Sequence, residues 1–514
     1  MRPTTGTWVL VAAILASSMG FIDGTAVNVA LPLVQRNLHA GADDLQWIVE
    51  GYGLFLSALI LVGGALGDRF GRRAVFAAGT SLFVLASVAC ALSPSVGVLI
   101  AARCVQGIGA ALEIPGSLAL ITATFSGAQR GKAIGTWSGF SAVTTALGPV
   151  LGGWLAQTWS WRAVFLVNVP LGIAVVAIAL ARVPESRDDD APRSIDVAGA
   201  ALATLGLGAL VFGLIGLQVV RVGAPYVAAA VAGGAALVFF GVYERRIARV
   251  PMLAAELFES KPFVGANVYT LLLYAALGGS LYFVPFDLIN VQGYSPLAAG
   301  ASLLPFIVIM FVASRWSGGL VSAIGARLPL TAGAALAAAG FAAFARTGIG
   351  GSYWTTFFPA TTLLGLGGAL FVAPLTTTVM DSVSVTEAGV ASGVNNAASR
   401  VAGLLAIAVM GLVLAAAFDA GLARATTGVS PAGVAALAAQ RSAILSGHVN
   451  AAAIPPADRA RVGAAIAQSY VAGFRAAMEL AAALALAAAL LAALWDWNRP
   501  SRAPGNPYRA RGVT

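Results

Sequence analysis

Apolar stretches of about 20 residues recur along the chain, and this feature limits the possible folds more than any other. A helix needs roughly 20 apolar residues to cross the hydrocarbon core of a bilayer. Of the 514 residues, 59% are hydrophobic and 10% are charged, whereas soluble domains carry about 25% charged residues. So few charges cannot cover a water-soluble surface. The sequence therefore predicts an all-α integral membrane protein.

Fourteen transmembrane helices are predicted from these stretches. The first apolar stretch continues to Leu31 and is too long for the core of a signal peptide, so we interpret it as an uncleaved span. The predicted spans are residues 8–31, 46–66, 74–93, 97–121, 132–156, 163–181, 195–217, 225–243, 263–289, 297–320, 328–346, 353–378, 390–417 and 471–495.

Lys and Arg residues distinguish the two sides of the membrane. With the N-terminus inside, the short inner segments hold 18 of them and the short outer loops hold 4. Because such residues gather in cytoplasmic loops, both termini are predicted to be cytoplasmic. The net charge of +9 then reflects topology and contacts with anionic lipid rather than nucleic-acid binding.

A short internal repeat indicates two related halves. GALGDRFGRR at residues 64–73 and GGLVSAIGAR at residues 318–327 share Gly, Leu, Gly and Arg at matching positions. Repeated halves are a common construction of transporters, whose substrate binds at the interface between them near the membrane midplane.

The first copy of the repeat is a candidate conformational latch. Its glycines permit a tight turn and close helix approach, and Asp68 can accept hydrogen bonds from a helix N-terminus or pair with an arginine. The alternative is a solvated charged turn. The predicted latch residues are Gly64, Asp68, Arg69, Gly71, Arg72 and Arg73.

This loop resembles the signature loop of the major facilitator superfamily. Three more segments resemble motifs of that superfamily, and the first is typical of its drug:proton antiporter family with fourteen spanners: FIDGTAVNVALP (21–32), LIAARCVQGIGAA (99–111) and GFSAVTTALGPVLGG (139–153). The resemblance implies two six-helix bundles plus two additional transmembrane helices. It also implies proton-driven efflux of drug-like, amphipathic or cationic compounds by alternating access.

The predicted organisation follows from the spans and the resemblance. It comprises an N-terminal bundle (1–182), two linker helices with flanking cytoplasmic loops (183–262), a C-terminal bundle (263–498) and a cytoplasmic tail (499–514). The long external segment 419–470 forms either short amphipathic helices on the outer face or a disordered loop.

The fifth predicted span carries the motif associated with antiporters. Pro149 removes a backbone hydrogen bond and bends the helix, and glycines allow tight packing against the other half. The expected role is a hinge or a seal against proton leak. The residues concerned are Gly139, Gly148, Pro149, Gly152 and Gly153.

Ionisable residues inside a membrane are costly and are functional candidates by default. Asp23 and Arg103 are predicted at depths of roughly 12 Å and 9 Å from the outer boundary. A pair between them would let protons and substrate compete, unless it is a static structural ion pair. Glu113 lies ten residues beyond Arg103 and is a second proton site, a site for cations, or a group in an inner vestibule.

Further residues are candidates for substrate contact or gating. Asn28 and Trp47 come from segments that resemble the family. Asp287 is either a gate residue or interfacial. Arg400 and Glu479 fall at nearly matching depths, so a structural pair between them is favoured over a transport role.

Several functions are excluded by what the sequence lacks. It contains no Walker motif, catalytic triad or metal-binding cluster, so an enzyme, a metal site and a cofactor are not expected, and the proton gradient is the expected energy source. The expected partners are a small-molecule substrate, protons, the lipid of the cell (inner) membrane and, where the host has an outer membrane, a periplasmic adaptor protein. Two alternatives stay open: a dedicated exporter of one metabolite or antibiotic, and a membrane sensor or scaffold on a transporter fold.

Overall fold

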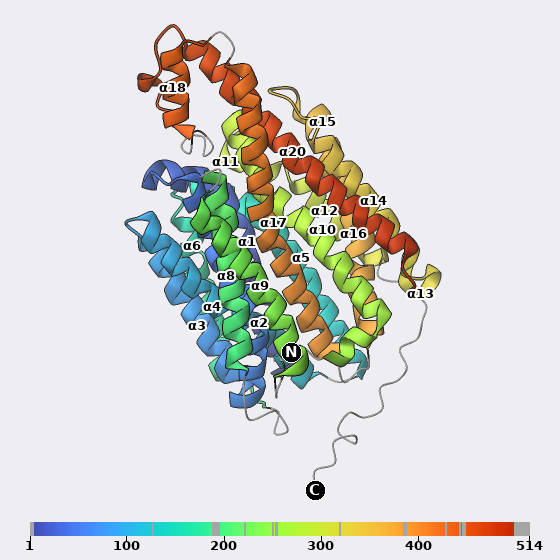
Figure 1. Cartoon of the computed structure of the whole chain (residues 1–514). Coiled ribbons are helices and arrows are strands. Elements are labelled where there is room, and N and C mark those ends of the chain that lie inside the picture. The colour runs from blue at the N-terminus through green and yellow to red at the C-terminus, as the bar shows by residue number, and fades with distance from the viewer. Residues whose placement is uncertain are drawn as a thin grey trace.

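The computed structural model describes residues 5–125, 127–187, 196–219, 223–248, 251, 255–317, 320–383, 388–426, 429–441, 444 and 449–497. Within these residues all regular structure is helical (Figure 1), which confirms the predicted all-α class. The helices of the first half and the linker are α1 (Thr5–Leu38), α2 (Ala42–Phe70), α3 (Arg72–Leu92), α4 (Val96–Thr124), α5 (Gly127–Thr158), α6 (Ala163–Leu166), α7 (Asn168–Arg182), α8 (Val197–Val219) and α9 (Ala224–Arg246).

The second half begins after a short 3-10 helix, η1 (Ala255–Glu259). Its helices are α10 (Lys261–Phe286), the π-helical η2 (Asp287–Val291), α11 (Pro296–Ala301), α12 (Leu304–Ser317), α13 (Leu320–Ile324), α14 (Arg327–Phe344), α15 (Tyr353–Thr356), α16 (Phe358–Asp381), α17 (Ala388–Ala425), α18 (Pro431–Ala439), η3 (Ala451–Ala453) and α20 (Arg459–Leu494).

Twelve helical segments among the described residues are long and apolar enough to cross a membrane. They coincide with twelve of the predicted spans, so the chain is a multi-pass membrane protein. The other two predicted spans fall on α5 and on the series α11 to α13, and the count of fourteen stays a prediction. Large apolar side chains such as Leu85 and Leu494 are 68% and 80% exposed, as expected of a surface that faces lipid.

The first seven helices form one bundle. Within it α1 packs against α4, α5 and α7, and α4 packs against α2 and α3. Glycines on α4 permit these close approaches, because a Cβ atom at Gly109 would lie 2.6 Å from the backbone nitrogen of Phe83, and one at Gly107 would collide with the carbonyl oxygen of Tyr52.

The second bundle contains α10, α12, α14, α16, α17 and α20, which pack against one another. Helices α8 and α9 form a separate pair, and α8 packs against both α2 and α17. The two bundles meet where α2 lies against α17, α5 lies against α11 and α12, and α1 lies against α10. The two additional helices therefore cover the junction between the bundles (Figure 1).

The internal repeat has a structural counterpart. Gly71 lies between α2 and α3 with a φ of 111°, and Gly325 lies between α13 and α14 with a φ of 77°. Glycine adopts such positive φ values at little cost. Both matching glycines therefore adopt a positive φ, which residues with a side chain disfavour, at the turn between two helices.

Contacts between helix ends show that the described ends of the chain lie on one face. The Arg182 guanidinium at the end of α7 lies 5.8 Å from the Trp8 ring near the start of α1. The Trp495 indole after α20 donates to the Lys261 carbonyl at the start of α10 at 3.0 Å. Helices α8 and α9 lie between α7 and α10 in the chain and pack against each other as a pair. The chain therefore returns to the same side before α10 begins, and these four helix ends share that side.

The segment predicted as an external loop is a folded cap. Helices α17 and α20 have 38 and 36 residues, so each is about 55 Å long and exceeds the roughly 30 Å of hydrocarbon. Their extensions pack with α18 around a small core, and Arg441 pairs with Asp419 at 2.7 Å. We call the described residues between 418 and 470 the outer cap, which Figure 1 shows at one end of the molecule. Its core residues are Phe418, Leu437, Ile444, Ile454, Val462 and Tyr470.

Candidate transport site between the two bundles

A buried ion pair joins α1 to α4. A guanidinium nitrogen of Arg103 donates to Oδ2 of Asp23, and the two side chains are 1% and 0% exposed. The geometry agrees with the similar depths estimated from the sequence. The role of the pair in proton coupling stays a prediction at this point.

Asp23 accepts two further hydrogen bonds. Its Oδ1 accepts from the side-chain amides of Gln106 at 3.0 Å and Asn168 at 3.1 Å. The same two amides donate to the hydroxyl of Ser87. Both oxygens of this fully buried carboxylate are therefore hydrogen-bonded, as buried polar groups normally are. The network spans α1, α3, α4 and α7.

Arg103 extends this network to the second helix. Its Nε donates to the carbonyl oxygen of Ile48 at 2.9 Å, and its guanidinium lies 4.3 Å from the centre of the Tyr52 ring. The Phe165 ring lies 5.7 Å away on another side. The guanidinium is therefore held by a carboxylate, a carbonyl and aromatic faces, and its position depends on four helices.

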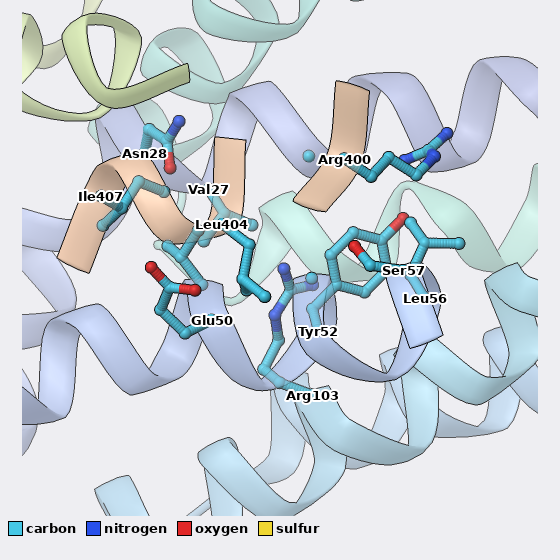
Figure 2. A pocket seen from close by; sticks show the side chains of 13 residues that line it. Val27, Asn28, Glu50, Tyr52, Leu56, Ser57, Arg103, Arg400, Leu404 and Ile407 are labelled. Atoms are coloured by element: carbon cyan, nitrogen blue, oxygen red, sulfur yellow. The ribbon is translucent and has the colours of Figure 1, made fainter. Parts of the chain in front are cut away.

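A cavity of about 170 Å³ lies beside this pair. Its walls come from α1, α2 and α4 of the first bundle and from α17 of the second, so it is situated between the bundles (Figure 2). The lining residues are Gly24, Val27, Asn28, Val49, Glu50, Tyr52, Gly53, Leu56, Ser57, Arg103, Arg400, Leu404 and Ile407. The set combines apolar side chains with one acidic and two basic ones, Glu50, Arg103 and Arg400, which is the composition of a small-molecule site.

Glu50 is a site residue that the sequence analysis missed. It lines the cavity and is 0% exposed, and neither of its carboxylate oxygens has a hydrogen-bond partner. The predicted span began at residue 46, which placed Glu50 near the boundary. Helix α2 begins at Ala42, so Glu50 lies about 12 Å along it. A lone acidic residue in an apolar stretch was the available signal.

The predicted pair between Arg400 and Glu479 is wrong. Glu479 is exposed on α20, whereas Arg400 lines the cavity from α17. The two residues match in depth, but depth says nothing about which face of a helix a residue occupies. Arg400 instead lies 5.9 Å from the Phe21 ring of α1.

Glu113 is buried away from the ion pair. It is 0% exposed and lies where α4 packs against α3, since a Cβ atom at Gly79 would be 2.9 Å from its backbone nitrogen. It is not among the residues that line the cavity. The structure therefore does not bring Glu113 together with Asp23, and a proton site there stays a prediction.

The remaining candidates are divided between the cavity and the protein interior. Asn28 lines the cavity, whereas Trp47 packs against an apolar cluster formed by α2, α8 and α17. Asp287 is buried at the start of η2, where its Oδ2 accepts from the side chain of Gln292 at 3.2 Å. It is thus fully buried and does not line the cavity, and the choice between a gate residue and an interfacial one stays a prediction.

The predicted latch contacts residues of the first bundle and, through Arg73, the segment that follows α7. Asp68 pairs with Arg72 at 2.8 Å, and Arg69 lies over the ring of Phe70. Gly64 packs near Pro115 of α4. These contacts leave the latch role as a prediction.

Glu185 follows α7 and belongs to the segment predicted as cytoplasmic loops that flank the linker helices. Its carboxylate accepts from the backbone nitrogens of Arg73 at 2.9 Å and Ala74 at 3.2 Å. It also lies 3.5 Å from the Arg73 guanidinium. Glu185 therefore caps the N-terminus of α3.

The antiporter-type motif joins α5 to helices of both bundles. A Cβ atom at Gly152 would lie 2.6 Å from the Ala26 carbonyl oxygen, and one at Gly148 would collide with Thr25. On the other side, a Cβ atom at Gly153 would collide with Pro296 of α11.

The contact with α11 is reciprocal, because a Cβ atom at Gly300 would collide with the Pro149 carbonyl. Gly139 also belongs to α5, but its surroundings lie outside the described residues. The glycines of the motif therefore form a tight seam between the bundles.

Comparison with known proteins identifies this arrangement. The family model of the Major Facilitator Superfamily matches residues 13–407. The chain belongs to this superfamily. It is 36% identical over 425 residues to the multidrug resistance protein Stp of Mycobacterium tuberculosis, covering 80% of this chain and 76% of the relative. It is 37% identical over 415 residues to a tetracenomycin C resistance and export protein of Streptomyces glaucescens, covering 79% and 75%.

Solved transporter structures share the fold. A bacterial homologue of the human lysosomal transporter Spinster, solved in an inward-facing and occupied conformation, matches with a TM-score of 0.65 and 18% identity over 96% of this chain and 97% of that one. The relatives named as resistance and export proteins place this major facilitator chain among the efflux transporters.

Proposed function

We propose that this transporter exports drug-like, amphipathic small molecules from the cell in exchange for protons. The observation that carries the proposal is the fully buried Asp23–Arg103 pair beside a cavity that both bundles line. A titratable group at that position can link the charge of the cavity to the movement of the bundles.

The coupling step depends on the Asp23 carboxylate. When Asp23 binds a proton, its attraction to Arg103 is lost, and the guanidinium becomes an uncompensated charge beside the cavity. A substrate and a proton would then favour different states of the pair. This competition is the basis of exchange, because the transporter changes conformation only with one of them bound.

Alternating access follows from the seam and the cavity. Pockets for drug-sized molecules have volumes of about 300–1,000 Å³, so a cavity of about 170 Å³ must widen before it can hold one. Parting of α17 from α2 would widen it from one side, while the glycine seam between α5 and α11 stays closed. With both termini in the cytoplasm of a cell-membrane protein, this seam would be on the external side.

The test is transport by the Asp23→Asn variant in proteoliposomes that contain a pH-sensitive dye. A susceptibility panel in a pump-deficient host first identifies a transported compound. Adding that compound should move protons in the wild type and not in Asp23→Asn. Asp381→Asn, an exposed acidic residue at the end of α16, is the matched control. Full proton movement in Asp23→Asn would overturn the proposal.

A dedicated exporter of one antibiotic is a second candidate. It is favoured by the similar identities of the chain to a multidrug resistance protein, 36%, and to a tetracenomycin C export protein, 37%. The same panel separates the two, since a dedicated exporter would protect against a single compound class. A periplasmic adaptor, if the host has an outer membrane, would meet the outer cap.

A further inference from the structure

Two ionisable side chains line the cavity without an ion pair or hydrogen bond among the described residues. Glu50 is fully buried, and both carboxylate oxygens are unsatisfied. The Nε of Arg400 is likewise unsatisfied, and this half-buried side chain lies 5.9 Å from the Phe21 ring and near Tyr52. Arg103 in the same cavity is, by contrast, neutralised by Asp23.

The two unsatisfied groups belong to different bundles and lie at different depths. Gly53 of α2 faces Leu404 of α17, and Gly393 of α17 faces Leu61 of α2, so the two helices run antiparallel. Arg400 lies one turn before Leu404 on α17, and Glu50 lies nearly one turn before Gly53 on α2. Because the helices are antiparallel, these two offsets point in opposite directions along the shared axis. Their Cα atoms are therefore separated by about 10 Å along the helix axes. Figure 2 shows Glu50 and Arg400 at opposite ends of the labelled set, with Arg103 between them.

Charge balance indicates what would occupy this space. A buried charge without a partner costs several kcal/mol, so such groups are normally paired. Asp23 neutralises Arg103, and the remaining carboxylate and guanidinium are too far apart to share a hydrogen bond. A cationic ligand would satisfy Glu50 and leave Arg400 uncompensated, and an anionic ligand would do the reverse. A ligand with one charge of each sign satisfies both.

We propose that this cavity binds zwitterionic amphipathic molecules, with a cationic group of the ligand on Glu50 and a carboxylate or similar acid on Arg400. The planar guanidinium suits a carboxylate, which it can bind through two parallel hydrogen bonds. Apolar side chains such as Val27, Leu56 and Ile407 contact the scaffold of the ligand. The proposal rests on the proposed function, because it names the substrate class of the same cavity.

The arrangement also links binding to movement. Glu50 belongs to the first bundle and Arg400 to the second, so a zwitterion would bridge the two when the cavity opens to admit it. A ligand with a single charge would hold only one bundle. Zwitterions should therefore bind more tightly than singly charged compounds of the same shape.

The experiment compares rhodamine B, a zwitterion at neutral pH, with its ethyl ester, a cation of the same ring system. Binding to the purified full-length protein in detergent is measured by fluorescence polarisation without a proton gradient. Rhodamine B should bind at least about tenfold more tightly, which corresponds to one charge-assisted hydrogen bond. An ester that binds as tightly as rhodamine B, or no binding of rhodamine B, would overturn the proposal.

Variants of Glu50 and Arg400 test which ligand charge each residue binds. Glu50→Gln should weaken the binding of both dyes by about tenfold or more, because both carry the cation. Arg400→Gln should weaken the binding of rhodamine B alone, so that it binds no more tightly than the ester. Arg400→Lys should retain part of the difference in affinity between the two dyes. Glu479→Gln, which changes an exposed residue, is the control. An equal loss of both dyes in a folded Arg400→Gln protein would contradict the proposal.

The outcome is separable from that of the proposed function. Asp23→Asn tests proton movement and the dye pair tests binding at equilibrium. If Asp23→Asn retained proton coupling while rhodamine B kept its advantage, proton exchange through Asp23 would fail and the zwitterion site would stand. If Asp23→Asn lost proton movement while rhodamine B bound no more tightly than its ester, the antiporter mechanism would stand and the zwitterion site would fail.

Discussion

The two bundles hold their buried polar groups in different ways. In the first bundle an ion pair, Asp23 with Arg103, is surrounded by amides and a hydroxyl from neighbouring helices. In the second, the Asn395 amide donates to Asn267 at 3.2 Å and to Thr270 at 2.8 Å, so this cluster is neutral. The difference indicates that a proton can change the charge state of the first cluster but not of the second. It predicts unequal effects of matched substitutions in the two bundles.

The largest effect is expected from Arg103→Ala. The substitution leaves Asp23 buried without its partner, which typically costs 3–5 kcal/mol. The unfolding temperature in detergent should fall by many degrees, and transport should be lost. The measurement is thermal unfolding of the purified protein together with substrate efflux from proteoliposomes.

A double variant is the control for this prediction. Asp23→Asn combined with Arg103→Gln removes both charges and keeps hydrogen-bonding groups, so it should recover most of the stability without recovering proton movement. Equal instability of the single and double variants would mean that packing rather than charge holds this region together.

Gly300→Val tests the seam at which the bundles meet. A side chain there would collide with the Pro149 carbonyl of α5, so the two helix ends must move apart. The substitution should shift the population towards the conformation in which this side is open, and transport should fall by tenfold or more. The measurement is labelling of a cysteine placed at Leu297, with Gly97→Ala as control because no atom lies within 4 Å of a Cβ there. Unchanged labelling would show that α5 and α11 accommodate the new side chain without opening this side of the transporter.

Glu185→Ala compares the two repeated turns. Glu185 caps α3 after Gly71, whereas among the described residues no side chain accepts from the first backbone nitrogens of α14 after Gly325. Loss of a cap costs about 1 kcal/mol, so the unfolding temperature should fall by a few degrees. Glu185→Gln keeps an acceptor oxygen, so its unfolding temperature should fall less than that of Glu185→Ala. A loss as large as that of Arg103→Ala would show that this turn has a role beyond capping.

The smallest effect is expected from Asn395→Ala in the neutral cluster. Hydrogen bonds between helices in membranes contribute about 0.6 kcal/mol each, so stability should change little. Proton movement driven by substrate should persist with the wild-type stoichiometry. Loss of coupling in this variant would break the contrast between the bundles.

Patterns along single helices predicted much of this molecule. The apolar stretches predicted twelve helices that the structure confirms, because the length of a membrane helix is set by the bilayer. The depths of Asp23 and Arg103 suggested a pair that the structure contains. Both results depend on position along a helix axis, which a sequence records directly.

Relations between helices were not predictable in the same way. Arg400 and Glu479 matched in depth but occupy different faces, and depth contains no rotational information. Glu50 was missed because α2 begins four residues before the predicted span. Glu185 caps α3 from a segment more than 100 residues away, and no local pattern marks such a contact.

The outer cap should move farther than the rest of the transporter when the second bundle tilts. Helices α17 and α20 continue from the second bundle into the cap without interruption, so they act as rigid rods anchored in the membrane. When that bundle tilts about the midplane, the tip of a rod travels farther than any residue near the substrate. A small rotation around the cavity is thereby magnified into a swing outside the bilayer, where a pair of fluorophores could follow each turnover.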